Sequence, residues 1–293
     1  MTTDGTPEDV YPIDLMPWDL AHADRATVER AIRSRVQTLY LGGGKMLARV
    51  LGRHKMFLHT SDRGFACHVA MDGFWDIWLT QFLARTLKPG MTAVDVGANY
   101  GYYTLLFAEA VTRGGRVLAI EPNPSASDLL QETVLLNGFA GHTTLLRTAL
   151  GPPGVSQHRL FVPFGEPKNT LLVDHGDYSG SETILVPVTT LDTVAADFAR
   201  VDLIKIDAEG AEIGIVAGMR EVIRRHRPKL VLEFNAARYA DPRGFLDELL
   251  ALYGQVFLVG FDGTAESLAP ETILTTQVGQ DWILYFQDDN AGA

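Results

Sequence analysis

The chain has 293 residues, of which 46% are hydrophobic, and its formal net charge at pH 7 is -11. This length and apolar content can form one large core together with an accessory segment. The acidic balance argues against a nucleic-acid partner, because binding to phosphates relies on clustered Lys and Arg, and no such cluster stands out. We therefore expect a small, neutral or cationic ligand.

Cys67 is the single cysteine, so no intramolecular disulfide can form and nothing in the composition requires an oxidising compartment. No segment approaches the roughly 20 consecutive apolar residues of a membrane helix. The acidic start of the chain also lacks the basic region of a signal peptide. We expect a cytoplasmic protein that does not bind membranes.

The chain is expected to divide into an amino-terminal cap, residues 1–88, and a second domain, residues 89–293. Within the cap, apolar residues at helical spacing predict two short helices over residues 24–52, hinged at three consecutive glycines. Alternation over residues 56–71 indicates a pair of strands, and helical periodicity returns over residues 74–87. The cap is therefore predicted to combine helices and strands.

From residue 91 onward, strand-like apolar runs alternate with helical periodicity, which is typical of an α/β fold. The predicted strands cover residues 93–96, 117–120, 144–147, 203–206, 230–234, 256–260 and 283–286. The predicted helices cover residues 103–111, 125–137, 211–226 and 244–253. This order predicts a doubly wound, mostly parallel, seven-stranded sheet.

Residues 151–190 interrupt the alternation. Two alternating runs, residues 159–162 and 183–188, flank a loop rich in Gly, Asp and Ser, and they predict a strand hairpin inserted beside the site. Asn169 in this loop is a candidate to reach toward a ligand. The alternative is that the insertion is only a surface feature.

The most informative motif is Asp-Val-Gly-Ala-Asn-Tyr-Gly at residues 95–101, which ends a buried strand and opens a helix. A second strand ends in Glu121, 20 residues after Gly101. Glycines let the backbone turn sharply and approach a ligand. An acid at the end of the second strand can accept hydrogen bonds from ribose hydroxyls. The motif therefore predicts a ligand that contains a nucleoside.

The same motif argues against a dinucleotide, because Asn99 and Tyr102 stand where a Gly-x-Gly-x-x-Gly fingerprint has its second and third glycines. Asp95 would also repel a pyrophosphate. A carboxylate suits the ammonium and sulfonium groups of S-adenosylmethionine, which carries no phosphate. We predict S-adenosylmethionine as the cofactor; an NAD-dependent oxidoreductase and an ordinary turn without ligand are the alternatives.

Further motifs accompany this turn: Thr190-Leu191-Asp192, Lys-Ile-Asp-Ala-Glu-Gly-Ala-Glu at residues 205–212, Arg227-Pro228 and Leu232-Glu233. Together with Glu121-Pro122 they resemble the FkbM family of class I S-adenosylmethionine-dependent methyltransferases, over residues 88–262. The resemblance implies a Rossmann-like class I methyltransferase fold and O-methylation of a hydroxyl on a sugar, polyketide or other secondary metabolite. The alternative is a catalytically silent S-adenosylmethionine-binding protein.

In an open parallel sheet, ligands bind outside the carboxyl ends of the strands. Acids are predicted at the ends of four different strands, so we expect them on one rim, with Asp95 near the methionine ammonium and Glu121 on the ribose. Thr148 and Ala149, after the third strand, are expected to flank the adenine. The predicted cofactor-binding residues are Asp95, Gly97, Asn99, Gly101, Thr104, Glu121, Pro122, Thr148, Ala149 and Asp207.

The remaining acids on this rim, Asp207, Glu209 and Glu233, face the acceptor and are the predicted catalytic residues. An acceptor alcohol must lose its proton, and a carboxylate can take it if burial and like charges raise its pKa toward neutrality. The alternative is that the same acids hold a divalent metal such as Mg²⁺. We expect no metal, because the resemblance fixes no complete Asp-Asp or Asp-Asn ligand set in this chain.

An amino-terminal cap on such a domain commonly folds over the open end of the sheet. Four cap side chains are therefore candidates to line the acceptor pocket: His59, His68, Phe74 and Trp75. The alternative for each is ordinary packing or a place on the surface.

Overall fold

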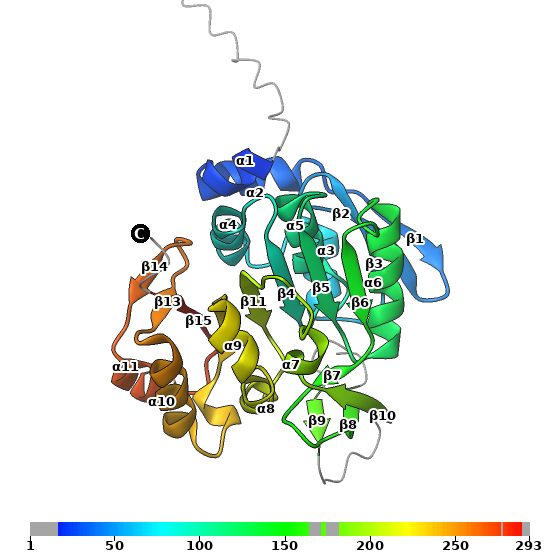
Figure 1. Ribbon diagram of the computed structural model, residues 1–293. Coiled ribbons are helices and arrows are strands. Elements are labelled where there is room, and N and C mark those ends of the chain that lie inside the picture. The colour runs from blue at the N-terminus through cyan, green and yellow to red at the C-terminus, as the bar shows by residue number, and fades with distance from the viewer. Residues whose placement is uncertain (1–16, 164–170, 174–181, 277, 289–293) are drawn as a thin grey trace, which may run out of the picture.

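The computed structural model describes residues 17–163, 171–173, 182–276 and 278–288. These residues form an α/β fold in which helices cover both faces of a central sheet (Figure 1). In spatial order its strands are β14 (Ala265–Ser267), β13 (Phe257–Val259), β15 (Trp282–Phe286), β12 (Lys229–Phe234), β11 (Leu203–Ile206), β4 (Thr92–Val96), β5 (Arg116–Ile120) and β6 (Thr143–Leu146).

The strands from β12 to β6 run parallel to one another, and β15 runs antiparallel to both of its neighbours. The seven strands predicted for the main sheet all lie in it. The predicted count of seven is nevertheless wrong, since the described residues place eight strands in the sheet. The extra strand is β14, which pairs with β13 at the sheet edge and is too short to show an alternating pattern.

Two apolar cores lie on opposite faces of the sheet, because side chains alternate between the faces along each strand. One core joins Ala93, Leu203 and Val231 to the helices α4 (Ile77–Thr86) and α5 (Tyr102–Val111). The other joins Val94, Ile204 and Leu232 to α8 (Glu212–Ala217), α9 (Arg220–His226) and α10 (Pro242–Tyr253). The central strands are thus buried on both sides, which explains their near-continuous apolar sequences.

The helix predicted over residues 211–226 is wrong, since α8 and α9 are separate helices that break at Gly218. The Gly218 carbonyl accepts a hydrogen bond from the Asp192 backbone N–H at 2.9 Å. A Cβ at Gly218 would lie 2.2 Å from the Gly151 carbonyl oxygen. Close backbone packing therefore interrupts the helix. The shorter helices around it are α7 (Leu191–Val194), η1 (Ala236–Arg238) and α11 (Pro270–Thr275).

The cap elements are α1 (Pro17–His22), α2 (Arg25–Arg33), β1 (Thr38–Gly42), β2 (Lys45–Val50), β3 (His54–His59), α3 (Phe65–Asp72) and α4. Their apolar side chains, among them Ile32, Met56 and Leu83, share one core with Phe107 of α5 and Val117 of β5. β3 also lies against α6 (Pro124–Leu136). The cap is therefore packed onto one face of the sheet; a boundary at residue 88 stays a prediction.

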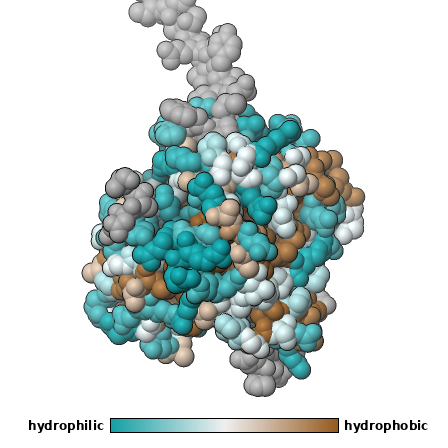
Figure 2. Space-filling view, viewed as in Figure 1, coloured by the Kyte–Doolittle hydropathy of each residue, from teal (hydrophilic) through white to brown (hydrophobic). Residues whose placement is uncertain are grey.

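Two cap predictions are wrong in part. The second helix predicted within residues 24–52 is a hairpin of β1 and β2, which turns through three glycines that all have positive φ. Leu39 and Leu41, which suggested helical spacing, are exposed on β1, where Figure 2 shows an apolar patch. In the segment predicted as two strands, residues 56–71, β3 is followed by α3 instead.

The segment of the chain between β6 and β11 forms a small second sheet. Its strands are β7 (Ala149–Leu150), β10 (Glu182–Thr189), β8 (Gln157–Val162) and β9 (Leu171–Val173), in that spatial order. β8 and β10 pair as antiparallel strands, and Leu160, Val186 and Val188 pack with Ala149 in a separate small core. Asn169 lies outside the described residues.

In the part of the chain that the structure describes, no helix combines the length and the apolar character that crossing a bilayer requires.

Gly97 brings the turn after β4 into contact with the turn after β11. Its φ is +75°, and a Cβ there would lie 1.8 Å from the Asp207 carbonyl oxygen. We expect Gly97→Ala to lower the free energy of unfolding by more than about 2 kcal/mol, through the positive φ and the backbone clash together.

Urea unfolding checks this, with Gly114→Ala as the matched control. A Cβ at Gly114 meets no described heavy atom within 4 Å, and its φ lies outside the left-handed region. Equal stability of the two variants would contradict the close packing of these turns.

Candidate functional site

A cavity of about 990 Å³ opens at the carboxyl ends of the parallel strands. Its wall combines the cap, the turns after β4, β5 and β11, the end of β12, the small second sheet and the segment before β15. Segments far apart in the sequence therefore meet here, as expected for a ligand site in an open parallel sheet.

Polarity changes along each central strand on the face that carries the cap. Side chains two positions apart in a strand share a face. On this face an apolar residue comes first and a charged residue ends the strand or follows it: Ala93 then Asp95 on β4, Val117 then Glu121 on β5, Leu203 then Lys205 and Asp207 on β11, and Val231 then Glu233 on β12. The apolar residues pack against the cap, and the charged residues gather near the carboxyl ends of the strands.

The glycine turn after β4 fixes the carboxyl group of Glu121. The backbone N–H of Asn99 donates to one Glu121 oxygen at 2.8 Å, and that of Asn123 donates to the other at 2.8 Å. Asn99 adopts a left-handed φ of 50°, and its buried Oδ1 has no hydrogen-bond partner among the described residues. Burial raises the pKa of Glu121 to about 7, although these two N–H donors oppose the shift.

Most of the predicted cofactor-binding residues line the cavity: Gly97, Asn99, Glu121, Pro122, Thr148, Ala149 and Asp207. Asp95, Gly101 and Thr104 are not part of the wall formed by the described residues. Gly101 allows α5 to pack on α6, because a Cβ there would lie 2.3 Å from Leu130 Cδ1. We propose that these three residues support the site from beneath.

Asp95 is fully buried and joins β4 to two neighbours. Its Oδ2 accepts a hydrogen bond from Thr104 Oγ1 at 2.6 Å, and its Oδ1 lies 3.7 Å from Lys205 Nζ. Lys205 Nζ also lies 3.4 Å from Asp207 Oδ2 and 4.8 Å from the centre of the Tyr103 ring. Burial alone would lower the pKa of Lys205, but the carboxylates around it outweigh burial and raise that pKa.

The run at residues 205–212 builds the turn after β11. Glu209 adopts a left-handed φ of 52°, a conformation that costs energy for a residue with a side chain. Glu212 holds this turn from below: its Oε1 accepts the backbone N–H groups of Ala208 at 3.0 Å and Gly210 at 3.2 Å. Its Oε2 accepts the Tyr239 hydroxyl at 2.9 Å. Glu212 therefore positions Glu209 instead of facing the cavity itself.

Arg238 binds the carboxyl groups on the far wall of the cavity. Its guanidinium nitrogens lie 2.8 Å from Glu233, 3.0 Å from Glu209 and 3.1 Å from Asp281. Burial and the neighbouring Asp207 raise the pKa of Glu233 well above its usual range, and Arg238 offsets only part of this.

The three predicted catalytic residues lie together. Asp207, Glu209 and Glu233 each offer one carboxylate oxygen within 4.8 Å of the others. Such an oxygen set matches the ligand chemistry of Mg²⁺. Two of the three carboxylates already pair with Arg238, however, and the third pairs with Lys205. The absence of a metal stays a prediction.

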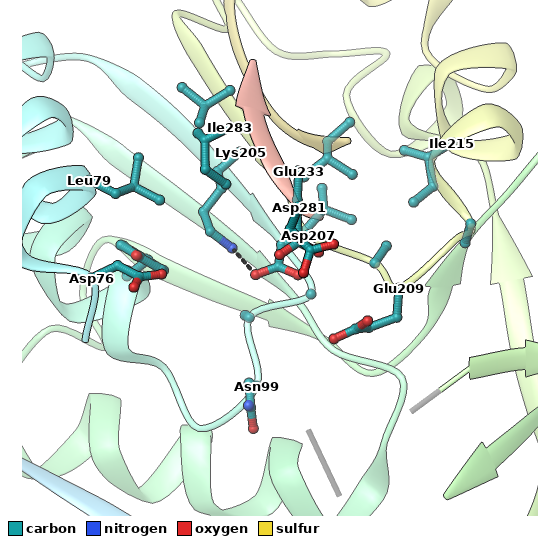
Figure 3. A pocket seen from close by; sticks show the side chains of 18 of the residues that line it. Asp76, Leu79, Asn99, Lys205, Asp207, Glu209, Ile215, Glu233, Asp281 and Ile283 are labelled. Carbon is teal, nitrogen blue, oxygen red and sulfur yellow. Dashed lines mark hydrogen bonds and ion pairs between the residues drawn. The ribbon is translucent and has the colours of Figure 1, made fainter. Parts of the chain in front are cut away.

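Sequence reasoning missed several residues of the wall. Asp76 precedes α4 with a φ of 35°, and Asp281 precedes β15. Figure 3 shows Asp76 on the opposite side of the pocket from Asp207, Asp281 and Glu233, with Lys205 between them. An acid directly before a helix is ordinarily interpreted as its N-cap, so the sequence gives no reason to assign Asp76 to a ligand site. Asp76 makes no side-chain cap hydrogen bond.

Of the four cap side chains considered, Trp75 lines the cavity. The others contact different partners: His59 bonds to Ser125 Oγ at 2.8 Å, His68 lies edge-on to Trp75, and Phe74 packs under the Arg33 guanidinium. Of these four side chains, Trp75 is therefore the one that we retain as an acceptor-pocket residue.

The raised pKa of Glu121 predicts a pH dependence of stability. The unfolded chain releases this proton near pH 4.5, whereas the folded protein retains it up to about pH 7. The protonated Glu121 contributes its full stabilisation below pH 4.5. This contribution to the free energy of unfolding falls as the pH rises from 4.5 and is lost once the pH passes 7. The loss amounts to at most roughly 3 kcal/mol.

We expect Glu121→Gln to remove this component, so that its unfolding free energy falls less than that of the unchanged protein between pH 4.5 and 7. Denaturant titrations across this range check it. Parallel pH profiles for the two proteins would show that Glu121 titrates normally.

Residues 95–258, more than half of the chain, match the methyltransferase FkbM domain. Over 71 residues the chain is 38% identical to the protein-L-isoaspartate O-methyltransferase of Aeropyrum pernix, which covers 24% of this chain and 27% of that protein. Over 158 residues it is 27% identical to the methyltransferase sdnD of Sordaria araneosa, which covers 44% of this chain and 60% of that protein.

A solved structure of methyltransferase FkbM from Methylobacillus flagellatus KT aligns with 21% identity and a TM-score of 0.42, over 72% of this chain and 53% of that one. The chain thus spans less than two thirds of the length of each of these three relatives. The family match begins at Asp95 in the glycine-turn motif and continues past Glu233 into β13. This chain belongs to the FkbM family of methyltransferases.

Proposed function

We propose that the protein transfers a methyl group from S-adenosylmethionine to a hydroxyl group of a small molecule. One observation carries the proposal: the glycine turn with its fixed acid and the cluster of Asp207, Glu209 and Glu233 open into the same cavity. A donor site and an acceptor site are thereby adjacent, as a direct transfer between two substrates requires.

The residues at one end of the cavity fit S-adenosylmethionine. Each Glu121 oxygen is held by one backbone N–H and retains a lone pair that can accept a ribose hydroxyl. The buried Asn99 Oδ1 lacks a partner among the described residues, and a polar ligand group would satisfy it. Leu150 and Leu160 add apolar surface beside Ala149 for a purine ring.

Bound S-adenosylmethionine would supply a methyl group on a sulfonium, which passes to the acceptor oxygen as the carbon–sulfur bond breaks. The protein's contribution is to orient the acceptor and to take its hydroxyl proton. Asp207 is the favoured base. Its side chain is 36% exposed at the cavity, and its ion pair with Lys205 is long at 3.4 Å.

Glu233 is the second candidate for the base. Its pKa is raised to about 9, so most of it already carries a proton at neutral pH, and Arg238 also holds it at 2.8 Å; both features make it a weaker candidate than Asp207. Glu209 is similarly paired with Arg238. Leu79, Trp75 and Ile283 give the cavity wall apolar surface, which limits the access of water to the reacting groups.

Asp207→Asn separates chemistry from cofactor binding, because it keeps the size of the side chain and removes the charge. We expect the turnover number to fall about 100-fold or more, with little change in affinity for S-adenosylhomocysteine. Methyl transfer to a panel of hydroxylated metabolites is followed by mass spectrometry, and affinity by calorimetry. The matched control is Asp247→Asn, because Asp247 is an exposed acid on α10.

Repeating the assay in the presence of a chelator distinguishes whether the acid cluster acts as a general base or holds a metal ion. A general-base enzyme keeps its activity in chelator, whereas an enzyme that clamps the acceptor on a metal loses activity and regains it with Mg²⁺. Full activity of Asp207→Asn would contradict the assignment of Asp207 in both cases.

A further inference from the structure

The cavity carries an excess of negative charge. Among the described residues, its wall contains six carboxyl side chains: Asp76, Glu121, Asp207, Glu209, Glu233 and Asp281. It contains two cationic side chains, Lys205 and Arg238. Even if Glu121 and Glu233 are both counted as neutral because of their raised pKa values, the four remaining carboxylates outnumber the two cations. An anionic acceptor would therefore be repelled from this space.

Both cations are already engaged by carboxylates. Lys205 lies between Asp207 at 3.4 Å and the buried Asp95 at 3.7 Å. Arg238 contacts three acids on the opposite wall at 2.8 to 3.1 Å. Neither Lys205 nor Arg238 is available to balance a further negative charge. A ligand that brings a positive charge would instead stabilise the desolvated carboxylates.

Tyr103 gives an independent indication of a polar ligand. Its side chain is 7% exposed and lines the cavity, and its hydroxyl has no hydrogen-bond partner among the residues that the structure describes. Leaving a buried hydroxyl unpaired is costly. Burial and the nearby carboxylates, Asp76 foremost, raise the pKa of Tyr103, so its hydroxyl stays protonated and can donate to a ligand oxygen.

Aromatic side chains from two distant parts of the chain line the same cavity. Trp75 and Trp78 come from the cap, and Phe261 and Trp282 come from the carboxyl-terminal part of the chain. Trp78 and Phe261 lie edge to face with their ring centres 5.2 Å apart. Indole and phenyl faces beside carboxylates are the surroundings in which organic ammonium groups bind well.

We propose that the acceptor end of the cavity recognises a cationic alcohol, a small hydroxylated molecule that also carries a protonated amine. An amino sugar or an aminocyclitol has this chemistry. The ammonium group binds between Asp76 and the acids around Arg238, while Tyr103 donates to an oxygen of the acceptor. This inference rests on the proposed function, because it assigns the other end of the cavity to the methyl donor.

The test uses three probes with the same two-carbon frame: ethanolamine, ethylene glycol and glycolate. Their binding is measured by saturation-transfer NMR, with and without saturating S-adenosylhomocysteine. We expect ethanolamine to bind at least about tenfold more tightly than ethylene glycol, and glycolate to bind more weakly than either. Equal affinities for ethanolamine and ethylene glycol would overturn the inference.

Variants locate the ammonium site. Asp76→Asn and Asp281→Asn should each weaken ethanolamine binding roughly three- to fivefold, whereas Asp247→Asn should leave it unchanged. Asn tolerates the positive φ of residue 76 about as well as Asp does, so this variant is expected to fold. Unchanged ethanolamine binding in both cavity variants would also overturn the inference.

Three further outcomes separate this inference from its alternatives. Displacement of ethanolamine by low concentrations of Mg²⁺ would show that the acids serve a metal, and would overturn it. Calorimetry that detects no S-adenosylhomocysteine binding would contradict the proposed function, while an ammonium preference in the ligand-free protein would still support the cation site. If the protein binds S-adenosylhomocysteine but shows no preference for ethanolamine over ethylene glycol, only the proposal of a cationic acceptor is contradicted.

Discussion

The site depends on a lysine buried between two carboxylates. Asp95 and Lys205 are direct neighbours on β4 and β11, and Lys205 also reaches Asp207 at the strand end. Removing one member of such a buried pair typically costs about 3 to 5 kcal/mol, because it leaves an uncompensated charge in the interior. The pair joins the glycine-turn motif to the Lys-Ile-Asp-Ala-Glu-Gly-Ala-Glu motif. The two most specific parts of the sequence are therefore linked by one interaction, which also sets the electrostatics of the cavity floor.

The central sheet and half of the cavity could be predicted from the sequence, because both depend on local patterns. β4 and β11 are buried on both faces, so each is a short, nearly apolar run; Asp95 is the penultimate residue of β4, and Asp207 directly follows β11. The cap was harder, since the same Leu residues satisfy helical spacing and an exposed strand, and only tertiary packing decides between them. Asp76 and Asp281 join the site from opposite ends of the chain, and no local spacing connects them. Asp95 was predicted as a ligand contact, but its complete burial places it behind the wall.

The arrangement explains why an acidic protein of this family can carry such a concentration of carboxylates at its centre. A few are structural: Asp95 pairs with Lys205 and Thr104, and Glu212 holds the turn that carries Glu209. The others face the cavity, where their combined negative charge attracts cations. A donor that carries a sulfonium and an ammonium but no phosphate matches the glycine-turn end, and a cationic alcohol matches the opposite end.

The most direct measurement of the central claim is a crystal structure of the protein with S-adenosylhomocysteine. Our account predicts that the ribose hydroxyls contact Glu121, that the adenine lies beside Thr148, Ala149 and Leu150, and that the sulfur faces Asp207 across an open acceptor space. A ligand bound elsewhere, or with its ribose away from Glu121, would contradict the account.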